Sequence, residues 1–163
     1  MREHDRRAIF GSGNPHIAAR PQIHAFILPP PYLGTVGYVR WIVDAMNVIG
    51  TRPDGWWKDR HGARARLVEQ LERWASPAGH QVTVVFEGPT SPPIHSLSIR
   101  IHHAPKATAN SADDEIVRLV SADDRPTEIT VVTSDATLAD RARAAGASIC
   151  AAARFRDLID PRP

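Results

Sequence analysis

Short runs rich in β-branched residues alternate with helical stretches along residues 39–163, and this alternation is what most limits the fold. Three runs have the length and composition of strands buried on both faces, namely Val39–Val43, Val82–Phe86 and Ile129–Thr133. Leu97–Ile101 alternates apolar and polar residues as a half-exposed strand does, and Ala147–Ala151 is a weaker fifth candidate. Strands separated by helices predict an α/β domain of three layers, with helices on both faces of a mainly parallel central sheet.

Apolar residues at helical spacing predict the helices between these strands. They are Leu67, Val68, Leu71 and Trp74 in the first helix, and Ile116, Leu119 and Val120 in the second. The second helix opens with Ser111 and Asp114 at the spacing of a capping box. The third runs from about Ser134 to Gly146, a residue suited to the position just after a helix.

The first 38 residues have a different composition from the rest of the chain. They hold five prolines and four glycines, and they show neither a helical nor a strand period. A charged start at Arg2–Arg7 is followed only by the short apolar run Ala25–Leu28, which is too short for a signal peptide. We expect residues 1–38 to be a flexible extension, or a segment added by a start codon assigned upstream of the true one near Val39. Residues 39–160 are then a single domain.

Charge and composition exclude several classes of protein. The net charge of +2 comes from residues 1–38, because residues 39–163 hold 16 basic and 16 acidic side chains. Overall charge therefore gives no support for a basic nucleic-acid-binding domain. The single cysteine, Cys150, excludes an intramolecular disulfide and a cysteine-based zinc site, and it favours a reducing, cytoplasmic location. No apolar stretch approaches the ~20 residues of a membrane span, so we expect no membrane partner.

Acidic residues directly follow three of the predicted strands. Asp44, Glu87 and Asp135 would lie at one edge of a parallel sheet, where such sheets bind ligands. Asp113 and Asp114 open a helix that can bring them to the same edge. Carboxylates ~4 Å apart repel by roughly 4 kcal/mol at an effective dielectric of 20, so their cluster requires a cation or raised pKa values. Oxygen ligands alone point to Mg²⁺ or Mn²⁺, and to metal-assisted attack of water on a phosphodiester.

Each of these acids also has a purely structural explanation. A carboxylate after a strand is often the N-cap of the next helix, as Asp135 would be. Asp113 and Asp114 in a first helical turn complement the helix dipole. Ser134 is expected to cap the third helix, whereas Thr133 and Ser134 could also hydrogen-bond a carboxylate or the attacking water. Singly the signals are weak, but together they favour a site.

Basic and aromatic residues are interleaved just after the first strand. This composition suits single-stranded RNA, because cations bind phosphates and indole rings stack on bases. The alternative is that one tryptophan packs onto the core and that Arg64 and Arg66 lie on a solvated helix face. Lys106 precedes the acidic helix and either reaches a phosphate or is simply solvated. The predicted RNA-binding residues are Arg52, Trp56, Trp57, Lys58, Arg60 and Lys106.

Four motifs carry a resemblance to a known family. WIVDAMNVIG, VTVVFEGP, NSADDEIV and VVTSDATLADRARAAGA occur in this order between about Val39 and Leu158. Together they resemble the NYN domain of YacP-like type, within the PIN-like nuclease superfamily. The resemblance implies a PIN-like fold, and it implies a metal-dependent ribonuclease or a protein acting on ribosome-bound or structured RNA.

The resemblance also implies roles for individual residues. Asn47 would shape the loop after the first strand, and Asp140 falls near a further family acid. The family often reads Asp-Gly-Tyr-Asn where this chain has Asp44-Ala45-Met46-Asn47, and Asp-Gly where it has Glu87-Gly88, so Glu87 is placed at the periphery. The predicted catalytic residues are Asp44, Asn47, Asp113, Asp114 and Asp135, and the predicted metal ligands are Asp44, Asp113, Asp114, Asp135 and Asp140.

The predicted function is therefore a metal-dependent endoribonuclease that uses Mg²⁺ or Mn²⁺ and acts on RNA, free or on the ribosome. The first alternative is a non-cleaving RNA- or ribosome-binding module. The second is the toxin of a toxin–antitoxin pair. The sequence leaves open whether the chain forms a homodimer.

Overall fold

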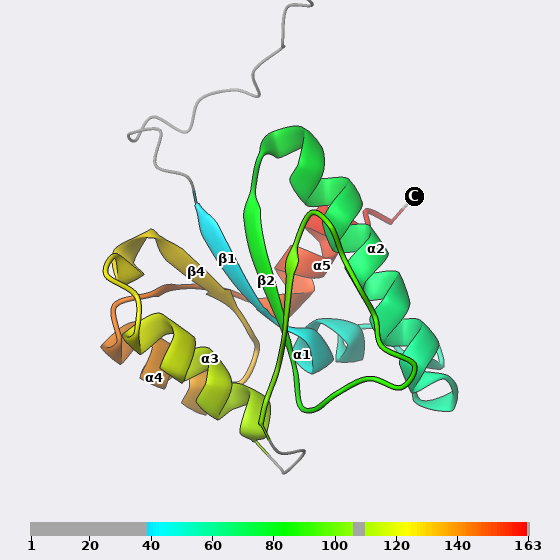
Figure 1. Ribbon diagram of the computed structural model, residues 1–163, viewed down its shortest axis with the longest axis horizontal. Coiled ribbons are helices and arrows are strands. Elements are labelled where there is room, and N and C mark those ends of the chain that lie inside the picture. The colour runs from blue at the N-terminus through cyan, green and yellow to red at the C-terminus, as the bar shows by residue number, and fades with distance from the viewer. Residues whose placement is uncertain (1–38, 106–109, 163) are drawn as a thin grey trace, which may run out of the picture. The chain divides into compact units, whose positions relative to one another are not determined.

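The computed structural model describes residues 39–105 and 110–162, which form one parallel sheet with helices on both faces (Figure 1). The predictions for residues 1–38 and for Lys106 lie outside the described residues. The strands are β1 (Arg40–Asp44), β2 (Gln81–Phe86), β3 (Arg100–His103), β4 (Ile129–Val132) and β5 (Ser148–Cys150). The helices are α1 (Ala45–Gly50), η1 (Trp56–Lys58), α2 (Arg60–Ala78), α3 (Ser111–Ser121), η2 (Pro126–Glu128), α4 (Ala136–Ala144) and α5 (Ala152–Ile159).

The strand order is β3-β2-β1-β4-β5, and every neighbouring pair is parallel. The chain builds the sheet outward from β1 to β3 and then returns to build β4 and β5 on the other side. The order therefore reverses between β1 and β4, and the loops after these two strands diverge there. The predicted α/β fold with a parallel sheet is confirmed.

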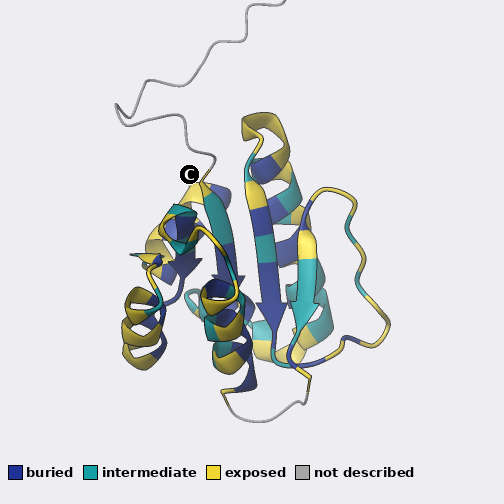
Figure 2. Ribbon diagram, turned by 60° about the vertical axis from the view of Figure 1, so that its left-hand side comes forward, coloured by how far each residue is buried: buried dark blue, intermediate teal, exposed yellow. Residues whose placement is uncertain are grey.

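The sheet is covered on both faces, which explains why its central strands are apolar throughout. In β1, Val43 belongs to the core cluster under α1, α2 and α5, whereas Ile42 belongs to the cluster under α3 and α4. Leu67, Leu71 and Phe155 fill the first core, and Ile116, Val120 and Leu138 fill the second. Figure 2 shows the central strands as buried between helices whose outer sides are exposed.

An aromatic cluster holds two helices against the first strand. The ring centroids of Trp41 and Trp74 lie 5.4 Å apart, and Phe155 lies 5.3 Å from Trp41 and 5.2 Å from Trp74. His80 stacks on Trp74 at 4.4 Å. Edge-to-face and tilted aromatic contacts of this kind add about 0.5–1.5 kcal/mol beyond area burial. They fix α2 and α5 on one face of the sheet.

The exposed strand begins later than its alternating pattern predicts. The expected strand was Leu97–Ile101, but β3 is Arg100–His103 and Leu97 is fully exposed. The Ser96 hydroxyl oxygen accepts hydrogen bonds from the backbone N–H groups of Ser98 and Ile99, at 3.2 and 3.0 Å. These donors are directed into a turn, so the residues carrying them do not join the sheet.

The predicted start of α3 at Ser111 and the predicted stop of α4 at Gly146 are confirmed, but Ser111 is not the residue that caps α3. Asn110, with a φ of 61°, is the N-cap of α3, and the Ser111 hydroxyl instead donates to the carbonyl of Glu87 at 3.0 Å. Gly146 follows α4 with a φ of 101°. Its N–H donates to the carbonyl of Arg143 at 2.9 Å, and the N–H of Ala147 donates to Ala142 at 3.0 Å. These two bonds form a Schellman motif.

Cys150 lies in β5 and is partly buried against the core. Among residues 39–105 and 110–162, no helix combines the length and apolar character that a membrane crossing demands.

Candidate active site at the carboxyl edge of the sheet

Asp44 ends β1 and is 3% exposed, which makes it the most buried acid of the predicted cluster. It is also the N-cap of α1: Oδ1 accepts from the backbone N–H of Asn47 at 3.2 Å, and Oδ2 accepts from Asn47 Nδ2 at 2.6 Å. Burial, with a smaller contribution from the charge of Asp113, raises the pKa of Asp44 to about 6 against the lowering effect of the Asn47 hydrogen bonds. Asp44 therefore changes charge close to neutral pH, as groups at functional sites often do.

Asn47 connects the two loops at which the strand order reverses. Its Nδ2 donates to Asp44, while its Oδ1 accepts from the backbone N–H of Ser134 at 3.0 Å. These bonds join the end of β1 to the segment after β4. Parallel sheets bind ligands at this switch point. Asn47 thus has the loop-shaping position that the resemblance implied.

Asp135 follows β4 and is the N-cap of α4, because its Oδ1 accepts from the N–H of Leu138 at 2.8 Å. Its own N–H donates to Thr133 Oγ1 at 3.1 Å. The predicted capping of this helix by Ser134 was wrong. Ser134 Oγ instead accepts from the N–H of Ala152 at 3.2 Å, and so caps the first residue of α5. That partner lies in the C-terminal segment, for which no helix was predicted.

Asp113 connects these acids electrostatically. Burial raises its pKa, and the nearby charge of Asp135 acts in the same direction, as do those of Asp114 and Glu87. Arg141 lowers it. Since Asp113 also raises the pKa of Asp44, the structure brings three predicted acids, from the end of β1, the start of α3 and the start of α4, within electrostatic range. Glu87, placed at the periphery from the sequence, adds its charge to the same group.

Two other predicted metal ligands, Asp114 and Asp140, form ion pairs with arginines. The Asp114 side chain is 72% exposed, and its carboxylate pairs with Arg141 at 2.8 Å. The Asp140 side chain is 80% exposed and pairs with Arg143 of the same helix at 2.9 Å. Asp113 and Asp114 therefore diverge, because consecutive residues of a helix point in different directions. Arg141 was missed from the sequence, since its partner lies in another helix.

The acids at this edge of the sheet are candidate ligands for a metal ion. Within the described residues, no group of three or more His, Cys, Asp or Glu side chains is placed to hold a metal ion directly. The donor set nevertheless suits Mg²⁺ or Mn²⁺, because it consists of carboxylate oxygens. Burial, together with the charge of neighbouring acids, raises the pKa of Asp44 and of Asp113, and a bound cation would offset both effects. Mg²⁺ usually keeps several waters and takes one or two carboxylates together with substrate phosphates. Asp44, Asp113 and Asp135 fit such a partly hydrated ion.

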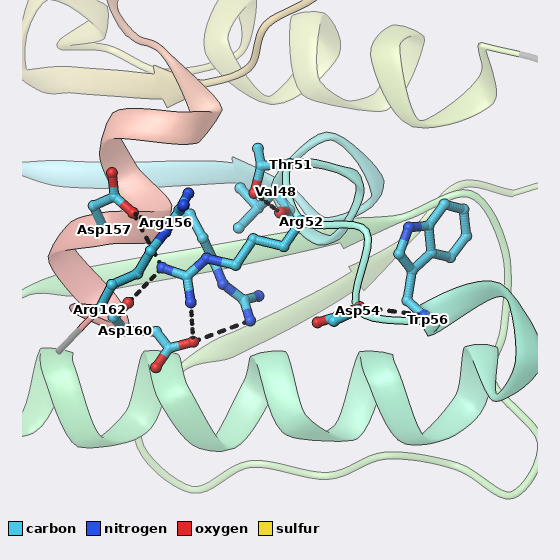
Figure 3. A network of polar contacts seen from close by, with 9 residues as sticks. All are labelled: Val48, Thr51, Arg52, Asp54, Trp56, Arg156, Asp157, Asp160 and Arg162. Atoms are coloured by element: carbon cyan, nitrogen blue, oxygen red, sulfur yellow. Dashed lines mark hydrogen bonds and ion pairs between the residues drawn. The ribbon is translucent and has the colours of Figure 1, made fainter.

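The basic and aromatic segment divides into an internal part and an external part. The Arg52 side chain is only 16% exposed, and its guanidinium donates to Asp160 Oδ2 at 2.6 Å and to Asp157 Oδ1 at 3.1 Å (Figure 3). Its predicted place on an RNA-binding surface is corrected to an ion pair with α5. Trp56 packs against the core, so one tryptophan does fold inward, and Arg60 lies 5.6 Å from its ring centroid. Trp57 is 53% exposed, and Lys58 and Arg60 are also exposed.

Comparisons with known proteins place the chain in a family. The family described as "YacP-like NYN domain" matches residues 41–162. Among curated proteins, none matches the chain. The crystal structure of Rae1 (YacP) from Bacillus subtilis, as its W164L mutant, superposes with a TM-score of 0.60 at 25% identity, covering 74% of this chain and 76% of that chain. A second crystal structure of Rae1 (YacP) from Bacillus subtilis gives a TM-score of 0.55 at 26% identity, with 74% of each chain covered. The predicted resemblance is confirmed: the chain belongs to the YacP-like NYN domain family, with a PIN-like nuclease type of fold.

Proposed function

We propose that the protein is a metal-dependent endoribonuclease, hydrolysing RNA phosphodiester bonds at Asp44, Asp113 and Asp135. One observation carries the proposal: buried Asp44 sits at the switch point of the sheet, and its charge is coupled to Asp113, which is in turn coupled to Asp135. A fold accepts such clustered carboxylates when a cation neutralises them. Membership of the YacP-like NYN family supports a nuclease-type activity.

The three acids would hold Mg²⁺ or Mn²⁺, partly through water. When bound, such an ion supplies an activated water and stabilises negative charge on the scissile phosphate. Asn47 fixes the Asp44 carboxylate through its 2.6 Å hydrogen bond and ties it to the β4 loop through the Ser134 N–H. Leu138 N–H fixes one oxygen of Asp135 at 2.8 Å. Asp114 pairs with Arg141 at 2.8 Å, so its carboxylate would neutralise that arginine instead of binding the ion directly.

RNA is the proposed partner, free or on the ribosome, and it would contact exposed residues of the segment that follows α1. Trp57 presents an indole ring on which a base can stack, a contact worth about 1–3 kcal/mol. Lys58 and Arg60 are exposed next to it and can bind phosphates. A cytoplasmic location suits an RNA-processing enzyme with a single, unpaired cysteine.

A non-cleaving RNA- or ribosome-binding module is the second candidate, and two observations favour it. Asp44 and Asp135 both cap helices, so each has a structural reason to be present. The described residues also hold no group of three ligands placed for direct metal binding. In this alternative, RNA binding would not depend on a cation, and the carboxylates would serve the fold alone.

The two candidates differ in a cleavage assay with the full 163-residue chain. Labelled single-stranded and hairpin RNA would be incubated with Mg²⁺, Mn²⁺ or EDTA. Wild type would be compared with Asp44→Asn and with Asp124→Asn, a matched control at an exposed aspartate before β4. We expect cleavage that requires metal, disappears in Asp44→Asn and persists in Asp124→Asn.

Two other results would contradict the proposed nuclease. If no RNA is cleaved and RNA binding is undiminished in EDTA, the protein is a non-cleaving binding module and not a nuclease. Cleavage that survives Asp44→Asn would exclude Asp44 from the chemistry and would contradict the proposal.

A further inference from the structure

A depression of about 480 Å³ opens beside Asn47, and the acidic cluster does not use it. Its volume lies in the range of small-ligand pockets, about 300–1,000 Å³. Three segments meet around it: α1 with the residue after it, the loop after β4, and the start of α5. The lining residues are Met46, Asn47, Gly50, Thr51, Ser134 and Ala153.

The lining carries no ionisable side chain. Asp44 accepts a hydrogen bond from the lining residue Asn47 at 2.6 Å, and its carboxylate, when ionised, would repel a phosphate. Met46 and Ala153 add apolar surface, and a thioether makes favourable contacts with aromatic rings. The depression therefore suits an uncharged group with an apolar face.

The polar groups around the depression retain unused hydrogen-bonding capacity. Thr51 Oγ1 donates to the carbonyl of Val48 at 2.7 Å, so its lone pairs remain to accept. Ser134 Oγ accepts from Ala152 N–H, so its own O–H remains to donate. Asn47 has one further N–H beyond the one given to Asp44. One acceptor and two donors match the mixed edge of a nucleobase or the hydroxyls of a ribose.

The walls of the depression are held in place by contacts on both sides. α5 is tied at its start by the hydrogen bond from Ala152 to Ser134. It is tied at its end by the ion pairs of Arg52 with Asp157 and Asp160, which Figure 3 shows together with the Thr51–Val48 bond. Thr51 and Ala153 are thus positioned before any ligand arrives. Pre-organisation of this kind lowers the entropy cost of binding.

We propose that this depression binds the nucleoside portion, base and ribose, of the RNA nucleotide adjoining the phosphate at the acidic cluster. The inference rests on the proposed function, because RNA as the substrate comes from there. It adds a separate binding subsite of opposite character: uncharged and partly apolar beside an acidic centre. The flat face of the base would lie against Met46, with its edge toward Thr51 and Ser134.

The test uses the uniformly ¹⁵N-labelled full chain in EDTA, titrated with each of the four ribonucleosides and, separately, with inorganic phosphate. We expect at least one ribonucleoside to shift the site amides and to saturate, whereas phosphate leaves them unchanged. The amides to be followed are those of Asn47, Gly50, Thr51, Ser134 and Ala153.

Two variants fill the depression from opposite walls. A Cβ at Gly50 would meet no atom within 4 Å, so the side chain of Gly50→Leu can leave the backbone without a clash. Ala153→Leu adds bulk from the exposed side of α5. Each should weaken ribonucleoside binding about tenfold or more, equivalent to about 1.4 kcal/mol. Ala144→Leu, at an exposed alanine of α4 that does not line the depression, is the matched control and should bind as wild type.

The inference is overturned if no ribonucleoside shifts these amides, if the shifts lie around Trp56 and Trp57 instead, or if both filled variants bind as wild type. Its failure is distinguishable from that of the proposed function. Ribonucleoside binding in EDTA requires neither metal nor hydrolysis. Ribonucleoside binding without RNA cleavage would support the subsite and contradict the nuclease. RNA cleavage without ribonucleoside binding at this depression would support the nuclease and contradict the subsite.

Discussion

At the scale of single residues, two opposing effects set the pKa of the Asp44 carboxyl group. Burial pushes the pKa of Asp44 upward, and the two Asn47 hydrogen bonds pull it down. The residue type and its place at a strand end were predictable, because a local rule governs them. The degree of burial was not, since it depends on helices packed from elsewhere in the chain. For the same reason the partner of Ser134, at Ala152, was missed.

The raised pKa of Asp44 predicts a pH dependence of stability in EDTA. With a pKa of about 6 when folded and 3.8 as the reference, the folded state binds more protons between these values. Folding stability therefore falls as the pH rises through this window, by on the order of 3 kcal/mol at most from this group. Asp44→Asn removes the charge and should gain stability relative to wild type as the pH rises from 4 to ~7.

Urea unfolding of both proteins at several pH values measures this difference. Asp124→Asn, at an exposed aspartate, should show no comparable trend. If the difference in the free energy of unfolding between Asp44→Asn and wild type stays constant with pH, ionisation of Asp44 carries no free-energy cost in the folded protein.

At the scale of elements, long periodic segments were predictable and short ones were not. The period of Leu67, Val68, Leu71 and Trp74 identified α2, because 19 residues give several turns of pattern. α1 has six residues and α5 has eight, too few for a period to stand out. Arg52 was misassigned as a consequence: without α5, nothing in the sequence indicated that Asp157 and Asp160 would take its guanidinium.

The Arg52 network predicts a stability effect that a surface arginine would not have. Arg52→Ala should destabilise the protein by about 2 kcal/mol, because the Arg52 side chain is only 16% exposed and hydrogen bonds to charged groups are worth about 1.5–3 kcal/mol. Arg52→Lys should recover only part of this, because an ammonium cannot reproduce the forked geometry. The matched control is Arg66→Ala, whose side chain is 57% exposed and pairs with Asp59 at 3.6 Å; it should cost less than about 1 kcal/mol. Equal losses in Arg52→Ala and Arg66→Ala, measured by urea unfolding, would contradict the network.

At the scale of the whole domain, the alternation of strands and helices was sufficient to predict the layers, because apolar strands require cover on both faces. The sheet places the ends of β1 and β4 side by side, and this juxtaposition gathers acids that lie far apart in the sequence. Residues 39–163 carry balanced charge, so the proposed RNA binding would depend on local contacts. Stacking of a base on an exposed indole ring is one such contact, worth about 1–3 kcal/mol.

Trp57 is therefore expected to contribute to RNA affinity more than other exposed side chains do. Trp57→Ala should weaken binding of single-stranded RNA by about 1–3 kcal/mol, roughly 5- to 150-fold, the value for one stacked base. Leu97→Ala removes a fully exposed apolar side chain elsewhere and serves as the control. Fluorescence anisotropy with a labelled oligonucleotide measures both. If Trp57→Ala and wild type bind single-stranded RNA with equal affinity, the Trp57 indole is not part of the RNA-binding surface.

If Asp44, Asp113 and Asp135 together hold a divalent cation, as proposed, Mn²⁺ should bind to them in the absence of RNA. Mn²⁺ would be titrated into the full chain and followed by electron paramagnetic resonance, in wild type, Asp44→Asn, Asp113→Asn and Asp140→Asn. We expect one site that is lost in Asp44→Asn and Asp113→Asn and kept in Asp140→Asn, because Asp140 pairs with Arg143 at an exposed position. Mn²⁺ binding that is unaffected by Asp44→Asn and Asp113→Asn, or absent from wild type, would contradict this proposal.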